Sequence, residues 1–209
     1  TRLPRAIRDV YKRQRITLEV WDAQLARYGA ELLAARLDTL VELREPTGDA
    51  YRAIAPVNNW TNASYRASFE LSDDPTELER AFAQALTARR RDELARGLTL
   101  VGPHRDEIVL TIGELPAKGY ASHGESWSLA LALRLGAFEL LRRDDIEAVL
   151  ILDDVFAELD AMRRQRLAEA VSGAEQVLVT AAVSSDVPDA LAGARFDVHA
   201  GTISEHREQ

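Results

Sequence analysis

Apolar positions near the start of the chain follow a helical period. They step by four, three and four residues and then continue on the same side, and they comprise Trp21, Leu25, Tyr28, Leu32, Leu33, Leu37 and Leu40. This spacing predicts a long amphipathic helix from Thr17 to about Glu45, broken by Pro46-Thr47-Gly48. The apolar side predicts a core-facing helix of an α-helical lobe, and the pattern covers too few heptads to favour a coiled-coil arm.

The pattern changes to alternation between Asn58 and Leu71, where Tyr65, Phe69 and Leu71 alternate with polar residues. Such a period of two favours a half-buried strand. A second helix is expected to open at Asp74-Pro75-Thr76-Glu77, with Asp74 as its cap and Glu77 at the capping-box position. Leu78, Phe82, Ala85 and Leu86 form its apolar stripe, and Gly97 is its expected end.

Beyond residue 97 the pattern becomes β-rich and then alternates strands with helices. The expected strands are 98–101 and 108–112 (with a hairpin turn at Gly113-Glu114), 148–152 and 176–180, and the expected helices are 128–141 and 161–171. The short continuous apolar run at 148–152 is typical of a strand buried on both faces. Strand-helix-strand order at this spacing predicts an α/β fold with a mostly parallel sheet flanked by helices.

Composition narrows the class of protein. The chain has 209 residues, 46% apolar and 29% charged, without cysteine and with a net charge of -8. These values favour a globular cytoplasmic protein without disulfides, and no apolar run is long enough to span a membrane. Because the chain is acidic overall, DNA binding would need a local basic patch, for which Arg89, Arg90 and Arg91 are the candidates beside the alternative of a solvated helix face.

Two acids follow the apolar run that ends at Leu152. Asp153 and Asp154 would lie at the carboxyl end of a buried strand, the edge at which open α/β sheets bind ligands. One carboxylate there can hold Mg²⁺, and its neighbour can polarise an attacking water in phosphoryl transfer. The alternative is that the two acids only cap the next turn.

A second candidate site precedes the helix expected at 128–141. Ser122 and Gly124, in the run Ser122-His123-Gly124-Glu125, offer a hydroxyl and a close backbone approach at an electropositive helix start. This combination suits an anion such as a phosphate. A capped helix start without any ligand is the alternative.

Together these segments resemble ATP-binding-cassette (ABC) ATPases. LDDVFAELD (152–160) is similar to their Walker B motif and D-loop, and ASHGES (121–126) is similar to their signature loop, with His123 and Glu125 in place of the commoner Gly and Gln. With VGPHRD (101–106), QVLVT (176–180) and WDAQLARYGAELLAAR (21–36), the pattern is similar to the carboxyl-terminal half of the RecF family of DNA-repair proteins, over about residues 15–206.

The resemblance implies a P-loop NTPase of ABC type that uses ATP and Mg²⁺. Asp153 would be the Mg²⁺ ligand and Asp154 the water-polarising residue. Ser122, Gly124 and Glu125 would contact the γ-phosphate across a dimer, with Asp160 in the D-loop. Thr180 stands where other ABC branches place a switch histidine. His104 and Arg105 lie in a loop that looks typical of the family, without an assigned role.

The resemblance also implies a division into an unpatterned segment (1–14), a helical lobe (15–97) and the carboxyl-terminal part of an ATPase head (98–209). Its expected activities are recombinational repair, replication-fork recovery and the SOS response. Its expected partners are single-stranded, duplex or gapped DNA, a second subunit bound on ATP, and the RecO and RecR proteins.

The sequence contains no Gly-x-x-x-x-Gly-Lys-Ser/Thr loop, which cradles nucleotide phosphates. We therefore expect the chain to be inactive as an ATPase alone. Because the sequence begins without Met, we also expect it to start in mid-protein or to have been processed. Two alternatives remain open. One is a head of another chromosome-maintenance ATPase, and the other is a non-catalytic interaction module in which both motifs are only caps and turns.

Overall fold

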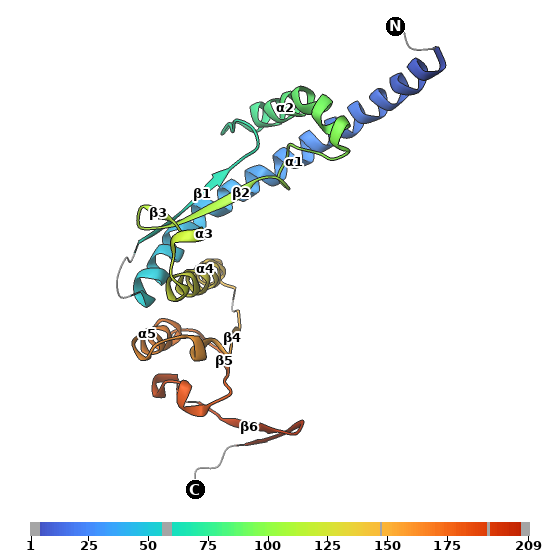
Figure 1. The fold of residues 1–209 in the computed structure, drawn as a ribbon. Coiled ribbons are helices and arrows are strands. Elements are labelled where there is room, and N and C mark those ends of the chain that lie inside the picture. Colours follow the sequence, from blue (N-terminus) through green and yellow to red (C-terminus); the bar gives the residue numbers. More distant parts are fainter. Residues whose placement is uncertain (1–4, 56–59, 147, 192, 206–209) are drawn as a thin grey trace. The chain divides into compact units, whose positions relative to one another are not determined.

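The computed structural model describes residues 5–55, 60–146, 148–191 and 193–205, with side chains from residue 17 onward (Figure 1). It divides into two compact units, Thr1–Glu42 with Ala63–Leu110 and Leu43–Asn62 with Thr111–Gln209. These units are defined by packing, so the expected division at residue 97 into lobe and head remains a prediction about function. Among the described helices, none has the length and apolarity to cross a bilayer.

The first unit is built on the amino-terminal part of α1 (Arg5–Ile54) and on α2 (Pro75–Arg96). Ala26 of α1 is buried with Phe82 and Leu86 of α2, and the Phe82 ring stacks on Phe69 with a centroid distance of 4.9 Å. A Cβ added at Gly29 would lie 2.3 Å from the Phe82 ring. A glycine is therefore required where the helix meets this ring.

The predicted apolar stripe of α1 is only partly buried. Its members Trp21 and Tyr28 are 62% and 59% exposed, whereas its member Leu33 is buried together with Ala26 and Ala30, which lie outside the stripe. The prediction was wrong for the two aromatic residues because it followed the largest side chains. The close approach of Phe82 selects small residues on the packed face instead.

The predicted break at Pro46 is also absent, because α1 continues to Ile54. A proline inside a helix costs about 3 kcal/mol, so packing has to compensate. Tyr51 and Ile54, in the turns after Pro46, are fully buried, and Gly136 lies so close that an added Cβ would be 2.5 Å from the Thr47 hydroxyl. The burial of this last part of α1 in the second unit keeps it helical.

The capping signals of α2 were read correctly. Asp74 accepts a hydrogen bond from the Glu77 amide at 2.9 Å, and Gly97 ends the helix in the left-handed conformation with φ 68°. Leu78, Phe82 and Leu86 are buried as expected. The Glu77 carboxylate binds Arg80. Of the two hydrogen bonds that make up the predicted capping box, the structure therefore shows the one that the Asp74 side chain accepts.

The strands of the first sheet lie in the order β1 (Thr61–Arg66), β2 (Glu107–Ile112) and β3 (Leu115–Pro116). The alternating burial predicted near residue 65 is present from Thr61 to Leu71, although the strand itself covers only Thr61–Arg66. Ile112 pairs with Leu115, which confirms the hairpin turn at Gly113-Glu114. The strand expected at 98–101 is absent, because the amides of Leu98 and Leu100 bond to Glu93 at the end of α2.

The second unit alternates helices with strands around one core. Its further elements are α3 (Ala117–Tyr120), α4 (His123–Arg143), β4 (Leu150–Asp153), η1 (Val155–Glu158), α5 (Ala161–Val171), β5 (Val177–Thr180), η2 (Ser184–Asp186), η3 (Asp189–Leu191), β6 (Phe196–His199) and β7 (Thr202–Glu205). β4 and β5 are parallel, and β6 and β7 form an antiparallel hairpin. The core joins Leu135 of α4, Leu152 of β4 and Leu167 of α5. This α/β arrangement confirms the predicted fold class.

The predicted burial of β4 on both faces is wrong for the described chain. Leu150 and Leu152 are buried, whereas Ile151 is 63% exposed and Leu178 on β5 is 47% exposed. The inward residues pack against the helical core, and the opposite face of this two-stranded sheet is open to solvent in the part of the chain that the structure describes.

Candidate nucleotide site

The carboxyl ends of β4 and β5 bring Asp153, Asp154 and Thr180 together. Asp153 and Thr180 are register partners on parallel strands, and the Thr180 hydroxyl donates to an oxygen of the Asp153 carboxylate. The Asp154 amide donates to both the carbonyl and the hydroxyl oxygens of Thr180, each at 3.1 Å. Both acids are exposed, so a ligand can reach their carboxylates.

Asp154 has a left-handed backbone with φ 52°, uncommon outside glycine. It begins η1, yet its side chain makes no capping hydrogen bond. The alternative in which this acid only caps the next turn therefore lacks the hydrogen bond that defines a cap. A conformation of this kind, held by neighbouring bonds, is common where a side chain has to be aimed.

The oxygen atoms around Asp153 suit a cation that takes most of its ligands from the substrate and from water. No cluster of three or more His, Cys, Asp or Glu able to hold a metal occurs among the described residues. Mg²⁺ is commonly bound by one or two carboxylates together with substrate phosphates and waters. An exposed carboxylate beside a hydroxyl, as at Asp153 and Thr180, fits that mode.

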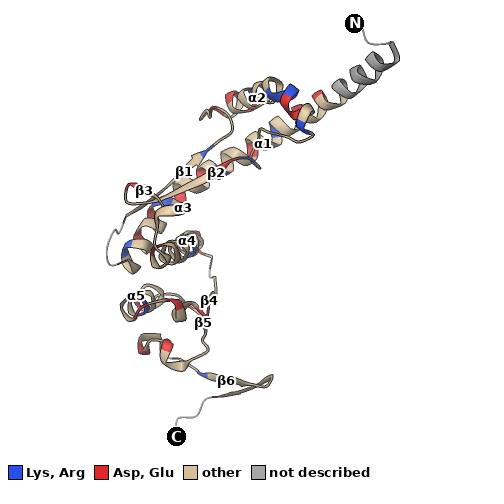
Figure 2. Cartoon of the chain, in the orientation of Figure 1, with Lys and Arg blue, Asp and Glu red and all other residues tan. Residues whose placement is uncertain are grey.

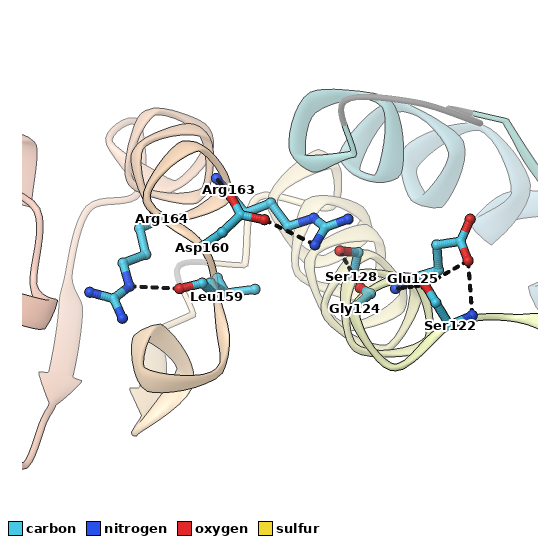
Figure 3. Close-up of polar contacts among 8 residues, drawn as sticks. All are labelled: Ser122, Gly124, Glu125, Ser128, Leu159, Asp160, Arg163 and Arg164. Atoms are coloured by element: carbon cyan, nitrogen blue, oxygen red, sulfur yellow. Dashed lines mark hydrogen bonds and ion pairs between the residues drawn. The ribbon is translucent and has the colours of Figure 1, made fainter.

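The helix start at Ser122 forms a full capping box (Figure 3). The Glu125 carboxylate accepts from the Ser122 amide at 2.9 Å and from its hydroxyl at 2.7 Å, and the Glu125 amide donates to Ser122 Oγ at 3.3 Å. The capped start left open from the sequence is thus present. The predicted contacts of Ser122 and Glu125 with a phosphate stay predictions, and a phosphate would compete with Glu125 for the hydroxyl.

Gly124 and Asp160 are brought together by a residue that sequence reasoning missed, Arg163. Asp160 begins α5 and binds the Arg163 amide at 2.9 Å and the guanidinium Nη1 at 3.1 Å (Figure 3). A Cβ added at Gly124 would lie 2.6 Å from Nη1 of Arg163. The i,i+3 spacing of Asp160 and Arg163 was a readable signal for the ion pair, whereas the contact with Gly124 was not.

Two further contacts hold this region. Arg164 donates from Nε to the Leu159 carbonyl and from Nη1 to Asp186 of η2, each at 2.8 Å. The imidazole of His123 lies 3.5 Å from the Glu158 carboxylate. The segment 158–160 is therefore bound both to the helix start of α4 and to the segment that follows β5.

The three candidate DNA-binding arginines differ in their surroundings. Arg90 is only 18% exposed and forms ion pairs with Asp22 and Glu19 of α1. Arg89 is 62% exposed beside Asp92, and Arg91 is exposed, at the α2 end where Figure 2 shows basic residues. Arg90 therefore has a structural contact, which leaves Arg89 and Arg91 as the accessible members of the patch.

The loop at 101–106 is held by hydrogen bonds with neighbouring segments. Arg105 donates from Nε to the Thr99 carbonyl at 2.8 Å, and the His104 ring lies close to Gly102. These contacts account for both side chains as parts of the loop.

Known proteins are similar to this chain over most of its length. No protein-family model matches the sequence. The DNA replication and repair protein RecF of Cutibacterium acnes is 60% identical over 201 residues, covering 90% of this chain and 51% of that protein. RecF of Frankia alni is 58% identical over 193 residues, with the same coverage. The chain is similar to RecF proteins over 90% of its length.

The chain spans about half the length of the RecF relatives it matches. Two solved structures of the recombination mediator protein RecF in the RecFOR pathway share its fold. The structure with ATP has a TM-score of 0.75 at 26% identity over 91% of this chain and 50% of that chain. The structure described as RecF-ATPrS has a TM-score of 0.73 at 24% identity over 90% and 50%. The fold is that of the RecF ABC-type ATPase.

Proposed function

We propose that this chain supplies the carboxyl-terminal half of the ATPase head of a RecF-type protein. In that role it takes part in ATP-dependent DNA binding during recombinational repair, replication-fork recovery and the SOS response. The observation that carries the proposal is the pair Asp153 and Asp154 at the edge of parallel strands, fixed by Thr180. The names of its relatives, which concern replication, repair and ATP, support the same reading.

The two acids take separate roles. Asp153 would hold Mg²⁺, which when bound neutralises charge on the transferring phosphate. Asp154 would accept a hydrogen bond from the attacking water and orient it, since its carboxylate is not used as a cap. Thr180 holds both residues in place through its hydroxyl.

The helix start of α4 would act on a nucleotide held by a second subunit. Ser122, Gly124 and Glu125 begin a helix of 21 residues, whose amino-terminal end favours an anion. Dimerisation on ATP would bring this end to the γ-phosphate, and the Ser122 hydroxyl would then exchange its Glu125 acceptor for a phosphate oxygen. The RecFOR pathway of the structural relatives supports RecO and RecR as partners.

The test uses a full-length form, in which the remaining half of a RecF protein is joined to this chain. Asp154→Asn should lower ATP turnover by about a hundredfold or more while ATP-dependent dimerisation persists. Asp153→Asn should weaken both. Asp38→Asn, which alters an exposed acid of α1, is the control and should change neither.

Turnover unaffected by Asp154→Asn would exclude the catalytic role. An oligomeric state that is the same with and without Mg·ATP would favour the non-catalytic interaction module. The identity over 90% of the chain favours RecF over the head of another chromosome-maintenance ATPase.

A further inference from the structure

We propose that Arg163 is a positioning residue that locks the helix start of α4 to Asp160. The signature loop and the D-loop of one subunit would then keep a fixed spacing when they meet the nucleotide of a second subunit. This inference rests on the proposed function above.

The Arg163 side chain is held more firmly than a surface ion pair. It is 20% exposed, whereas its partner Asp160 is 54% exposed. Asp160 binds both the amide and the guanidinium of Arg163, and the Nε atom is buried without a partner among the described residues. A buried N–H without a partner is unfavourable, so the position reflects the packing around the guanidinium.

That packing is against Gly124. The position of a Cβ at Gly124 lies 2.6 Å from Nη1, 3.4 Å from Cζ and 3.6 Å from Nη2 of Arg163. The guanidinium therefore fills the space that a side chain would need. In this subunit a side chain at position 124 would have to displace the Arg163 guanidinium.

The charges show that this arrangement needs its partners. A cation at the amino-terminal end of a helix opposes the helix dipole. Asp160 offsets that repulsion directly, and Glu125 lies in the same first turn of α4. Burial raises the pKa of the Tyr51 phenol, which the Glu125 charge reinforces and the Arg163 charge opposes. Both charges thus act on the same buried group at the end of α1.

The first experiment measures coupling between Gly124 and Arg163 in the full-length form. Gly124→Ala should lower ATP-dependent dimerisation at least tenfold, because the methyl group displaces the guanidinium. In an Arg163→Gln background the same change should cost less than threefold, since the clash is gone. Equal fold-losses in both backgrounds would overturn the proposal. Urea midpoints of the wild type, the two single variants and the double variant measure the coupling between the two residues in the stability of the fold.

The second experiment separates shape from charge. Arg163→Lys keeps the charge but loses the planar fork, so it should lower dimerisation and kcat about as much as Arg163→Gln, with ATP binding by the single subunit unchanged. Rescue by lysine would show that charge suffices and would refute positioning by packing. Arg142→Gln, which removes a more exposed arginine paired with Glu139 in α4, is the control.

The two hypotheses fail differently. If Asp154→Asn does not affect turnover, the proposed function is wrong, and the coupling in urea still tests the contact. If Asp154→Asn abolishes turnover while Arg163→Gln leaves dimerisation and kcat at their wild-type values, only the positioning role is refuted.

Discussion

Thr180 and Asp153 face each other at the ends of two parallel strands, and the hydroxyl of Thr180 donates to the carboxylate of Asp153. The same hydroxyl oxygen accepts from the Asp154 amide at 3.1 Å. The Thr180 side chain thereby contacts both acids, through the carboxylate of Asp153 and the backbone amide of Asp154. Other ABC branches are expected to place a histidine here, and in this chain a threonine makes the connection to the acids.

Removing this hydroxyl should disturb the site more than the fold. Thr180→Val preserves the shape of the side chain and deletes both hydrogen bonds, so we expect a loss of about 1 kcal/mol in the free energy of unfolding. In the full-length form we expect ATP turnover to fall by about tenfold or more, because the Asp153 carboxylate and the Asp154 amide each lose their hydrogen bond to the hydroxyl, and only the bond of Asp154 to the Thr180 carbonyl remains. Thr180→Ser should retain most of both properties. Urea titration and steady-state turnover check this, and wild-type turnover in Thr180→Val would contradict it.

The chain by itself should hydrolyse no ATP above background. It holds the acids of the proposed site but no Gly-rich phosphate loop with its lysine in its sequence. Phosphate release measured on the purified 209-residue chain, beside its Asp153→Asn variant, checks this expectation. Turnover that disappears with Asp153→Asn would show that the chain is a complete ATPase.

Local patterns predicted the elements of the site well. The apolar run before Asp153 predicts the strand, and the caps at Asp74 and Gly97 were readable because capping depends on a few neighbouring residues, whereas α4 begins at His123 and not at the expected residue 128. The alternation near Tyr65 survived as alternating burial for the same reason. Each of these signals is local, so no knowledge of distant residues was needed.

The errors came from contacts between distant residues. The pattern predicts a helix end at Pro46, but the packing of Tyr51 and Ile54 prolongs the helix. It also predicts a buried Trp21, which is exposed. The contact of Arg163 with Gly124 joins the start of α4 to α5 across the sequence. No periodicity carries that information, and neither spacing nor composition distinguishes a phosphate-facing glycine from an arginine-facing one.

Charge reversal should separate Arg89 and Arg91 from Arg90. If α2 contacts the DNA backbone, the double variant Arg89→Glu, Arg91→Glu should bind gapped or duplex DNA more weakly. The slope of log K against log salt concentration should then fall by the equivalent of about two phosphate contacts. Equilibrium binding at several salt concentrations measures both quantities. Binding that keeps its strength and its salt dependence in the double variant would remove this patch from the interface.

Arg90→Gln should act on stability instead. It leaves Asp22 without its cation in a mostly covered position, so we expect a loss of about 2 kcal/mol in the free energy of unfolding. DNA binding by the folded variant should match that of the wild type. A selective loss of DNA binding at unchanged stability would show that Arg90 also contacts DNA.

Asp22 should make the first unit less stable as the pH rises. Burial raises the pKa of Asp22, Arg90 opposes this, and Glu93 and Glu19 reinforce it. The unfolded chain releases the Asp22 proton near pH 3.8 and the folded chain releases it at higher pH, so folding takes up a proton between the two values. The contribution of Asp22 is therefore most favourable below pH 3.8 and is lost as the pH rises through the folded pKa.

Asp22→Asn, which mimics the protonated form, should be as stable as the wild type or more stable by up to about 1 kcal/mol at neutral pH. Urea titrations of both proteins from about pH 3 to 7 measure the difference; a wild type that gains stability over the variant as the pH rises would show that the Arg90 pair outweighs burial.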